Sequence, residues 1–144
     1  MLVSDAAPET PLNVSIGSHR RVYWTQTELE HFKAIKNSLG GTVNDVLLAV
    51  VSGALARWLR TRGVRTEGLE LRAQVPVNIR TAAHEHALGN ELTSLFVELP
   101  VAEPDAITRY ERIVEQSAAI KRGSQTSGGK GLVEKWLEDG PRLA

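Results

Sequence analysis

The fold of this chain is decided by residues 40–49, which read Gly-Gly-Thr-Val-Asn-Asp-Val-Leu-Leu-Ala. Glycine accepts the left-handed backbone that commonly ends a helix, so the Gly40-Gly41 pair predicts a helix terminus. Thr42 is then expected to be the N-cap of a second helix, with Asp45 at the positively polarised first turn. Residues 43–59 are apolar on nearly every face of this helix. Such a helix belongs inside a protein and needs neighbours on several sides.

A shorter helix is predicted before the glycine pair. Thr27 and Glu30 have the spacing of a capping box, in which each side chain satisfies a backbone N–H of the first turn. The apolar residues that follow at helical spacing are Leu29, Phe32, Ile35 and Leu39. Further upstream, residues 21–25 read Arg-Val-Tyr-Trp-Thr and favour a strand. Residues 1–18 are rich in Pro, Ser, Gly and Asn, which is typical of an extended, poorly ordered lead-in.

Two strands and two further helices are predicted after the long helix. Residues 69–75 alternate between apolar and polar side chains and predict a strand that stops or bends at Pro76. A polar loop over residues 81–90 separates it from a second alternating strand over residues 92–99. A helix is expected to open at Pro104 and to run to about Arg122, with its apolar stripe at Ile107, Tyr110, Val114 and Ala118. A last helical fragment is expected over residues 132–137.

The predicted order of elements is strand, helix, helix, strand, strand, helix, helix. This order is typical of an α/β domain, with α+β as the alternative, in which helices pack on a small sheet. We therefore divide the chain into a lead-in (residues 1–18), an α/β domain (residues 19–122) and a flexible glycine- and serine-rich linker with a partial helix (residues 123–144).

Composition limits the classes of protein to which the chain can belong. Its 144 residues are 42% hydrophobic and 24% charged, as in a soluble globular domain. The 17 basic and 17 acidic residues cancel, and a balanced charge argues against a nucleic-acid partner. There is no cysteine, so disulfides and thiolate chemistry are excluded. The first ten residues lack the apolar core of a signal peptide, and the longest apolar run covers only Val46–Val51, so we expect a cytoplasmic protein.

A search for catalytic and metal-binding patterns finds no complete site. The glycine-rich run over residues 123–131 fails as a phosphate loop because Gly131, not Ser or Thr, follows Lys130. His84 and His86 lie two residues apart, whereas zinc sites on helices use a spacing of four, so we expect no metal. Asn44 and Asp45 are open to two interpretations. They form an ordinary capped helix start, or they line a site at which the free N–H groups of the first turn meet a polar ligand.

Four segments, in the same order, resemble the bacterial wax ester synthase/diacylglycerol acyltransferase family. Residues 12–21 resemble the family's Leu-Asn-x-x-Ile-Gly-x-x-Arg-Arg stretch, and residues 40–49 resemble its Asn-Asp motif at the head of a long helix. Residues 75–80, Val-Pro-Val-Asn-Ile-Arg, resemble its Val-Pro-Val-Ser-Val-Arg strand end, with Asn78 in place of serine. Residues 88–90, Leu-Gly-Asn, resemble its Gly-Asn segment before the next strand. Together these segments cover about residues 11–122.

The resemblance implies a fold and a reaction. The fold is that of the CoA-dependent acyltransferases, which resembles chloramphenicol acetyltransferase and has two similar halves facing each other across a channel. The reaction is transfer of a fatty acyl group from acyl-CoA to diacylglycerol or a long-chain alcohol, with acyl-CoA as a substrate and no cofactor. In the family a His-His-x-x-x-Asp-Gly motif in the first half supplies the general base. No two histidines are adjacent in this sequence, which therefore resembles about a third of the enzyme, from its second half.

The resemblance also implies roles for particular residues. Asn44 and Asp45 would support the catalytic site without being its base, and Asn78, Arg80 and Asn90 would lie toward the substrate. The partners would be acyl-CoA, a lipid alcohol, and either the missing N-terminal half or a second copy of the chain. Contact with the inner membrane or with lipid bodies would be peripheral. The alternative, from another functional class, is a non-catalytic domain that keeps the fold to bind an acyl chain or a protein.

Overall fold

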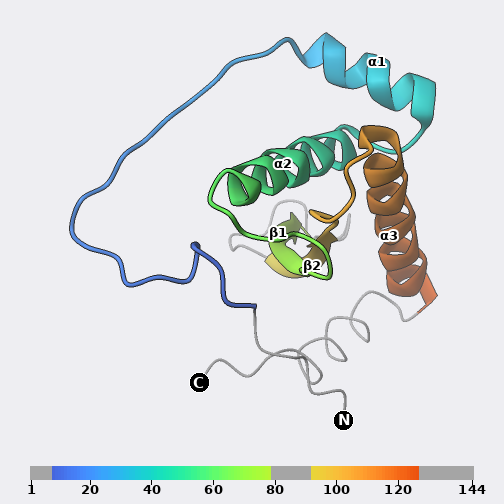
Figure 1. Cartoon of the computed structure of the whole chain (residues 1–144). Coiled ribbons are helices and arrows are strands. Elements are labelled where there is room, and N and C mark those ends of the chain that lie inside the picture. The colour runs from blue at the N-terminus through green and yellow to red at the C-terminus, as the bar shows by residue number, and fades with distance from the viewer. Residues whose placement is uncertain (1–7, 79–91, 127–144) are drawn as a thin grey trace.

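The computed structural model describes residues 8–78 and 92–126, and these form a small α/β domain (Figure 1). The elements follow in the order α1 (Leu29–Leu39), α2 (Val43–Arg60), β1 (Leu71–Asn78), β2 (Leu92–Leu99) and α3 (Ala106–Thr126). The α/β class predicted from the sequence is therefore confirmed, as are the two helices on either side of the glycine pair.

The sheet of the described residues consists of β1 and β2, which pair antiparallel from Leu71 opposite Leu99 to Asn78 opposite Leu92. The predicted bounds of β2 are confirmed. Strand β1 begins at Leu71, two residues later than predicted, and a stop at Pro76 is wrong because the strand continues through Pro76, which lies opposite Ser94. Proline lacks an N–H donor but is tolerated on an edge strand, and in this two-stranded sheet both strands have an open edge.

The region before α1 differs from its prediction. Residues 21–25 form no strand, and Val22, Tyr23 and Trp24 are 77–84% exposed. β-branched and aromatic residues favour a strand only where a partner strand and a packing surface are present, and among residues 8–78 and 92–126 this segment forms no backbone–backbone hydrogen bond. The predicted Thr27 capping box is also absent, since α1 has Glu28 as its N-cap and no side-chain capping bond.

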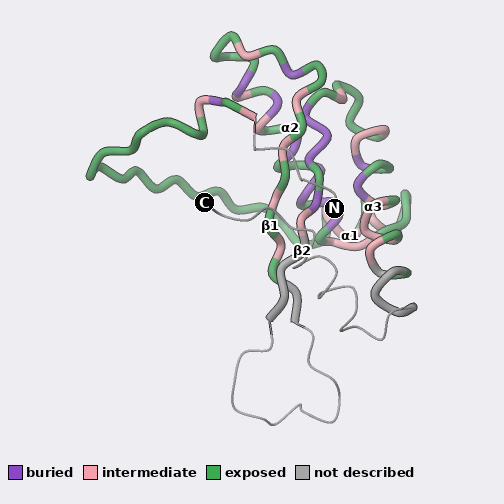
Figure 2. The backbone as a smooth tube through the Cα atoms, turned by 90° about the horizontal axis from the view of Figure 1, so that it is seen from below, coloured by how far each residue is buried: buried purple, intermediate pink, exposed green. Residues whose placement is uncertain are grey.

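The core is built on α2, which contacts α1, α3 and β2 as its apolar sequence requires. Its buried residues include Val46, Leu48 and Ala56, which pack with residues of β2 and α3, among them Val97 and Ile113. In Figure 2 many of the buried positions lie along α2 and α3, whereas residues 12–28, before α1, are exposed. The prediction of a central helix is thus confirmed on one face of α2; its opposite face remains open to solvent.

The third helix is longer than predicted. It begins at Ala106, not at Pro104, and its start is capped by Asp105, whose Oδ1 accepts the Thr108 N–H at 2.8 Å. This hydrogen bond, with that of the Thr108 side chain, lowers the pKa of Asp105. The helix then passes Arg122, its predicted end, and includes Gly123. A single helical glycine costs only about 1 kcal/mol relative to alanine, so Gly123 does not stop the helix. The predicted helix over residues 132–137 lies outside the described residues.

No single helix of residues 8–78 and 92–126 is long and apolar enough to cross a bilayer. Taken together, α1 and α2 satisfy both criteria, but their axes are bent by 102° at the intervening turn.

That turn gives a matched pair of substitutions. Gly40 and Gly41 both have positive φ angles, 83° and 78°. A Cβ at Gly40 would meet nothing within 4 Å, whereas one at Gly41 would lie 2.7 Å from both Tyr110 Oη and Val114 Cγ2. We expect Gly40→Ala to lower the free energy of unfolding by about 1–2 kcal/mol through backbone strain alone. Gly41→Ala should add about 1–3 kcal/mol through the clash with α3. Urea unfolding of both variants measures the difference, and equal losses would show that α3 does not pack on Gly41.

Candidate functional site

The head of α2 has the capping geometry that the sequence predicts. Thr42 is the N-cap, and its Oγ1 accepts the Asp45 N–H at 3.2 Å. In return Asp45 Oδ2 accepts the Thr42 N–H at 2.8 Å, which completes a capping box. Asp45 thus does more than place its charge near the helix dipole, because it also fixes the backbone that enters α2.

Asp45 is nearly inaccessible to solvent, with 3% of its surface exposed. Burying a carboxylate is costly unless hydrogen bonds replace its lost water. Here Oδ2 accepts the Thr42 hydroxyl at 2.7 Å in addition to the Thr42 N–H, and Oδ1 accepts the hydroxyl of Ser117 at 2.6 Å. Within residues 8–78 and 92–126, no lysine or arginine forms an ion pair with Asp45. Neutral donors therefore hold the carboxylate.

Helix α3 supplies a second contact to the same turn through Tyr110. This side chain is 3% exposed, and its hydroxyl donates to the carbonyl oxygen of Gly40, 70 residues earlier in the chain. Burial raises the pKa of the Tyr110 hydroxyl above 10.0, and the nearby Asp45 charge raises it further. We call Thr42, Asp45, Tyr110 and Ser117 the head cluster. It joins the glycine turn, the first turn of α2 and one face of α3.

The sequence identified only part of the head cluster. Thr42 and Asp45 follow from the spacing of a capping motif, whereas Ser117 has no local signal because its partner lies 72 residues away. Tyr110 was correctly predicted to face the core as a member of the apolar stripe of α3. Its hydrogen bond to Gly40 could not be predicted, since periodicity shows which face is buried and not which atom the hydroxyl meets.

The described structure includes only two of the other predicted site residues, Asn44 and Asn78. Asn44 follows Thr42 on the first turn, but it is exposed. Asn78 ends β1 opposite Leu92. Arg80 and Asn90 lie outside the described residues, as do His84 and His86. Their proposed places beside a substrate therefore stay predictions.

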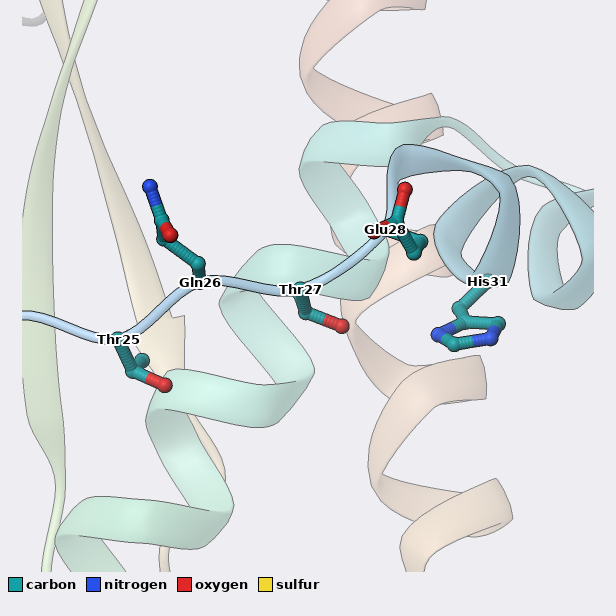
Figure 3. A pocket seen from close by; sticks show the side chains of 5 residues that line it. All are labelled: Thr25, Gln26, Thr27, Glu28 and His31. Atoms are coloured by element: carbon teal, nitrogen blue, oxygen red, sulfur yellow. The ribbon is translucent and has the colours of Figure 1, made fainter.

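An open depression of about 770 Å³ lies before and along the first turn of α1 (Figure 3). Its lining residues are Thr25, Gln26, Thr27, Glu28 and His31. Only His31 among them has a side chain that commonly acts as a base near neutral pH. The part of the chain that the structure describes holds no group of three or more His, Cys, Asp or Glu that could bind a metal ion. The depression alone therefore does not define a reaction.

Arg109 connects α3 to the middle of α2. Its guanidinium donates to the carbonyl oxygens of Ala49 at 3.3 Å and Glu103 at 2.8 Å. It passes beside Gly53, where a Cβ would lie 2.8 Å from Nη2. Gly53 therefore leaves room for this side chain, which links α2 to the loop that precedes α3. Nearby on α2, the buried hydroxyl of Ser52 has no hydrogen-bond partner among the residues that the structure describes.

Comparisons with known proteins agree on one family. Residues 1–47 match the model of the wax ester synthase/diacylglycerol acyltransferase catalytic domain. A Mycobacterium tuberculosis protein that carries the name of a diacylglycerol O-acyltransferase is 30% identical over 135 residues, which is 94% of this chain and 26% of that protein. A second such M. tuberculosis protein is 34% identical over 108 residues, covering 75% of this chain and 24% of the relative. A Mycobacterium bovis relative is 31% identical over 129 residues, covering 87% of this chain and 25% of the relative.

The chain therefore spans about a quarter of the length of the curated relatives that it matches. No solved structure matches it.

The raised pKa of Tyr110 gives a test of the head cluster. Its folded-state pKa exceeds the ordinary value of 10.0, so the unfolded chain releases this proton first as the pH rises. The resulting stability is present below about pH 10 and is lost above it. We expect the free energy of unfolding to fall more steeply with alkaline pH in the wild type than in Tyr110→Phe. At neutral pH, Tyr110→Phe should cost about 0.5–1.5 kcal/mol for the lost hydrogen bond. Urea unfolding from neutral pH to about pH 11 checks both; parallel pH profiles would contradict the account.

Proposed function

The chain belongs to the wax ester synthase/diacylglycerol acyltransferase family, and from this membership we propose that it forms one wall of an acyl-CoA-dependent O-acyltransferase. The acyl acceptor would be diacylglycerol or a long-chain alcohol. Because the chain spans only a quarter of its relatives, the proposal concerns the whole enzyme of which these residues make a part.

One observation carries this proposal beyond family membership. The match to the catalytic domain ends at residue 47 and therefore includes the capped head of α2. At that position the chain buries a carboxylate with three hydrogen-bond donors, including one from α3. An exposed N-cap interaction is worth about 1 kcal/mol and needs no such enclosure. We infer that Asp45 holds the glycine turn and the start of α2 in the geometry that the acyltransferase requires.

The proposed chemistry is direct transfer between two substrates. A histidine base takes the proton of the alcohol, whose oxygen attacks the thioester carbonyl carbon of acyl-CoA. The carbon–sulfur bond then breaks, and CoA leaves as a thiol after accepting a proton. The four histidines of this sequence are His19, His31, His84 and His86, and no two are adjacent. The base would therefore come from a His-His-x-x-x-Asp-Gly segment outside these 144 residues.

The remaining residue roles belong to the same proposal. Asn44, exposed on the first turn of α2, would face the channel, with Asp45 behind it as a positioning residue. Asn78, Arg80 and Asn90 would lie on the side that receives CoA. Reaction would take place in the cytoplasm, with the enzyme in peripheral contact with the membrane or lipid bodies that hold its alcohol substrate.

A chimera tests the proposal most sharply. In it the 144-residue chain replaces the 135 aligned residues of the M. tuberculosis relative. We expect the isolated chain to transfer no acyl group from acyl-CoA above a heat-killed control, and the chimera to do so. Asp45→Asn in the chimera should lower kcat at least about tenfold while the protein remains folded, since a displaced site costs rate more than stability.

The matched control is Ile113→Val, which removes one methyl group from a fully buried core position away from the capping box. It should cost about 0.5–1.5 kcal/mol of stability and leave kcat nearly unchanged. A chimera with Asp45→Asn that is fully active and slightly less stable would show that capping alone explains this residue. A chimera that binds acyl-CoA without turnover would favour the non-catalytic binding domain.

A further inference from the structure

We propose that the arm (residues 11–28), α1 and the outer face of α2 form a docking surface for another part of an acyltransferase of this family. Its occupant is the portion of the enzyme that these 144 residues do not span, in the same polypeptide or in a separate one. The proposal rests on the proposed function for the identity of the occupant, and on the burial pattern for the surface itself.

The burial pattern changes where the match to the catalytic domain ends. Residues 12–31 are all exposed and α1 has no buried residue, although this region carries many apolar side chains. In chain order, the first buried residue of the hydrophobic core is Val46. The match to the catalytic domain covers residues 1–47. Within that match the arm and α1 have no buried residue in the described structure, although Phe32 of α1 packs against the core.

The outer face of α2 is apolar and open. Leu47, Val50 and Val51 are 48%, 54% and 38% exposed, and they lie opposite the buried positions of the same helix. Toward the end of α2 this face continues into an apolar groove of about 340 Å³, lined by Leu12, Val51, Ala54, Leu55 and Trp58. Contiguous apolar surface of this kind marks an interaction site more often than a free surface.

The arm adds backbone groups that need partners. It leaves the body of the domain as an extended segment (Figure 1), and within the described structure residues 14–27 form no backbone–backbone hydrogen bond. Its Val22, Tyr23 and Trp24 are highly exposed and have the composition of a strand. An extended apolar segment of this kind binds by adding a strand to an open sheet edge, because that pairs its N–H and C=O groups.

The chemistry of the surface selects one occupant. A lipid bilayer could cover apolar side chains, but it offers no partners for the backbone of the arm. A protein supplies both an apolar face and a strand edge. The matched residues are only about a quarter of the relative's length, and the arm, α1 and the head of α2 are the segments that match the family's catalytic-domain model. The rest of that domain is therefore the occupant that the observations favour over a second copy of this chain.

Trypsin cleavage at Arg20 and Arg21 measures whether the arm is covered. Both residues are exposed in this chain, so the isolated protein should be cut there rapidly. In the chimera with the M. tuberculosis relative, we expect cleavage to slow at least about tenfold, because a docked segment is cut only when it opens and tenfold protection needs only about 1.4 kcal/mol. Cleavage after Arg65, in the exposed turn between α2 and β1, is the internal reference. Equal rates at the arm in both proteins would overturn the proposal.

Two matched variants locate the docking surface. Val50 on α2 and Ile107 on α3 are 54% and 52% exposed, so a glutamate at either position remains solvated in the isolated chain. In the chimera, Val50→Glu should restore rapid cleavage of the arm because it places a charge in an apolar interface. Ile107→Glu should leave the protection unchanged. Equal effects of the two variants would contradict the assignment of the surface.

The remaining outcomes separate this proposal from competing ones. A second copy would be identified as the occupant by three results together. The isolated chain would have a dimer mass in light scattering, its arm would be protected from trypsin, and Val50→Glu would remove that protection. If the chimera does not fold, the isolated chain is mixed with the unaligned part of the relative, and unchanged cleavage of the arm then contradicts the proposal. A chimera whose arm is protected but which is catalytically inactive would contradict the proposed function and support the docking surface. An active chimera whose arm is unprotected would support the proposed function and contradict the docking surface.

Discussion

The carboxylate of Asp45 connects three stretches of chain that local sequence preferences would leave independent. It accepts the N–H and the hydroxyl of Thr42 at the start of α2, and the hydroxyl of Ser117 on α3. Tyr110, about two turns closer to the start of α3 on the same side, donates to the carbonyl of Gly40 in the turn itself. The bend between α1 and α2 is therefore set by contacts with α3 as well as by the two glycines. This bend sets the direction in which α2 runs, and that direction determines which neighbours the core residues of α2 meet.

Most of the secondary structure could be predicted because its signals are local. The glycine pair, the Thr42 cap and the strict alternation of residues 92–99 each specify an element within a few residues. The failures have a common physical cause. A strand at residues 21–25 requires an edge that the described chain does not offer, and the stop expected at Pro76 would hold only in a central strand. Whether residues 21–25 form a strand and whether a strand stops at Pro76 both depend on the neighbouring strands in space, which the local sequence does not specify.

The candidate site was predictable to a smaller extent. Asp45 could be found because its capping partner lies three residues away, but nothing near Ser117 in the sequence distinguishes it from any exposed helical serine. Family resemblance assigned roles to Asn78, Arg80 and Asn90, of which Arg80 and Asn90 lie outside the described residues, so these roles stay predictions. The match covers only 26% of the length of the M. tuberculosis relative. A helix that is apolar on nearly every face needs neighbours on several sides, and the described residues leave Leu47, Val50 and Val51 of α2 exposed.

The central claim is that Asp45 couples the head of α2 to α3, and a double-mutant cycle measures this coupling directly. The variants Asp45→Ala, Ser117→Ala and their combination are compared with the wild type by urea unfolding at neutral pH. Because the hydrogen bond involves a buried charge, the account predicts a coupling free energy of about 1–3 kcal/mol, so that the double variant loses less stability than the sum of the single losses. Losses that add to within about 0.5 kcal/mol would show that the two residues act independently, and would contradict the account.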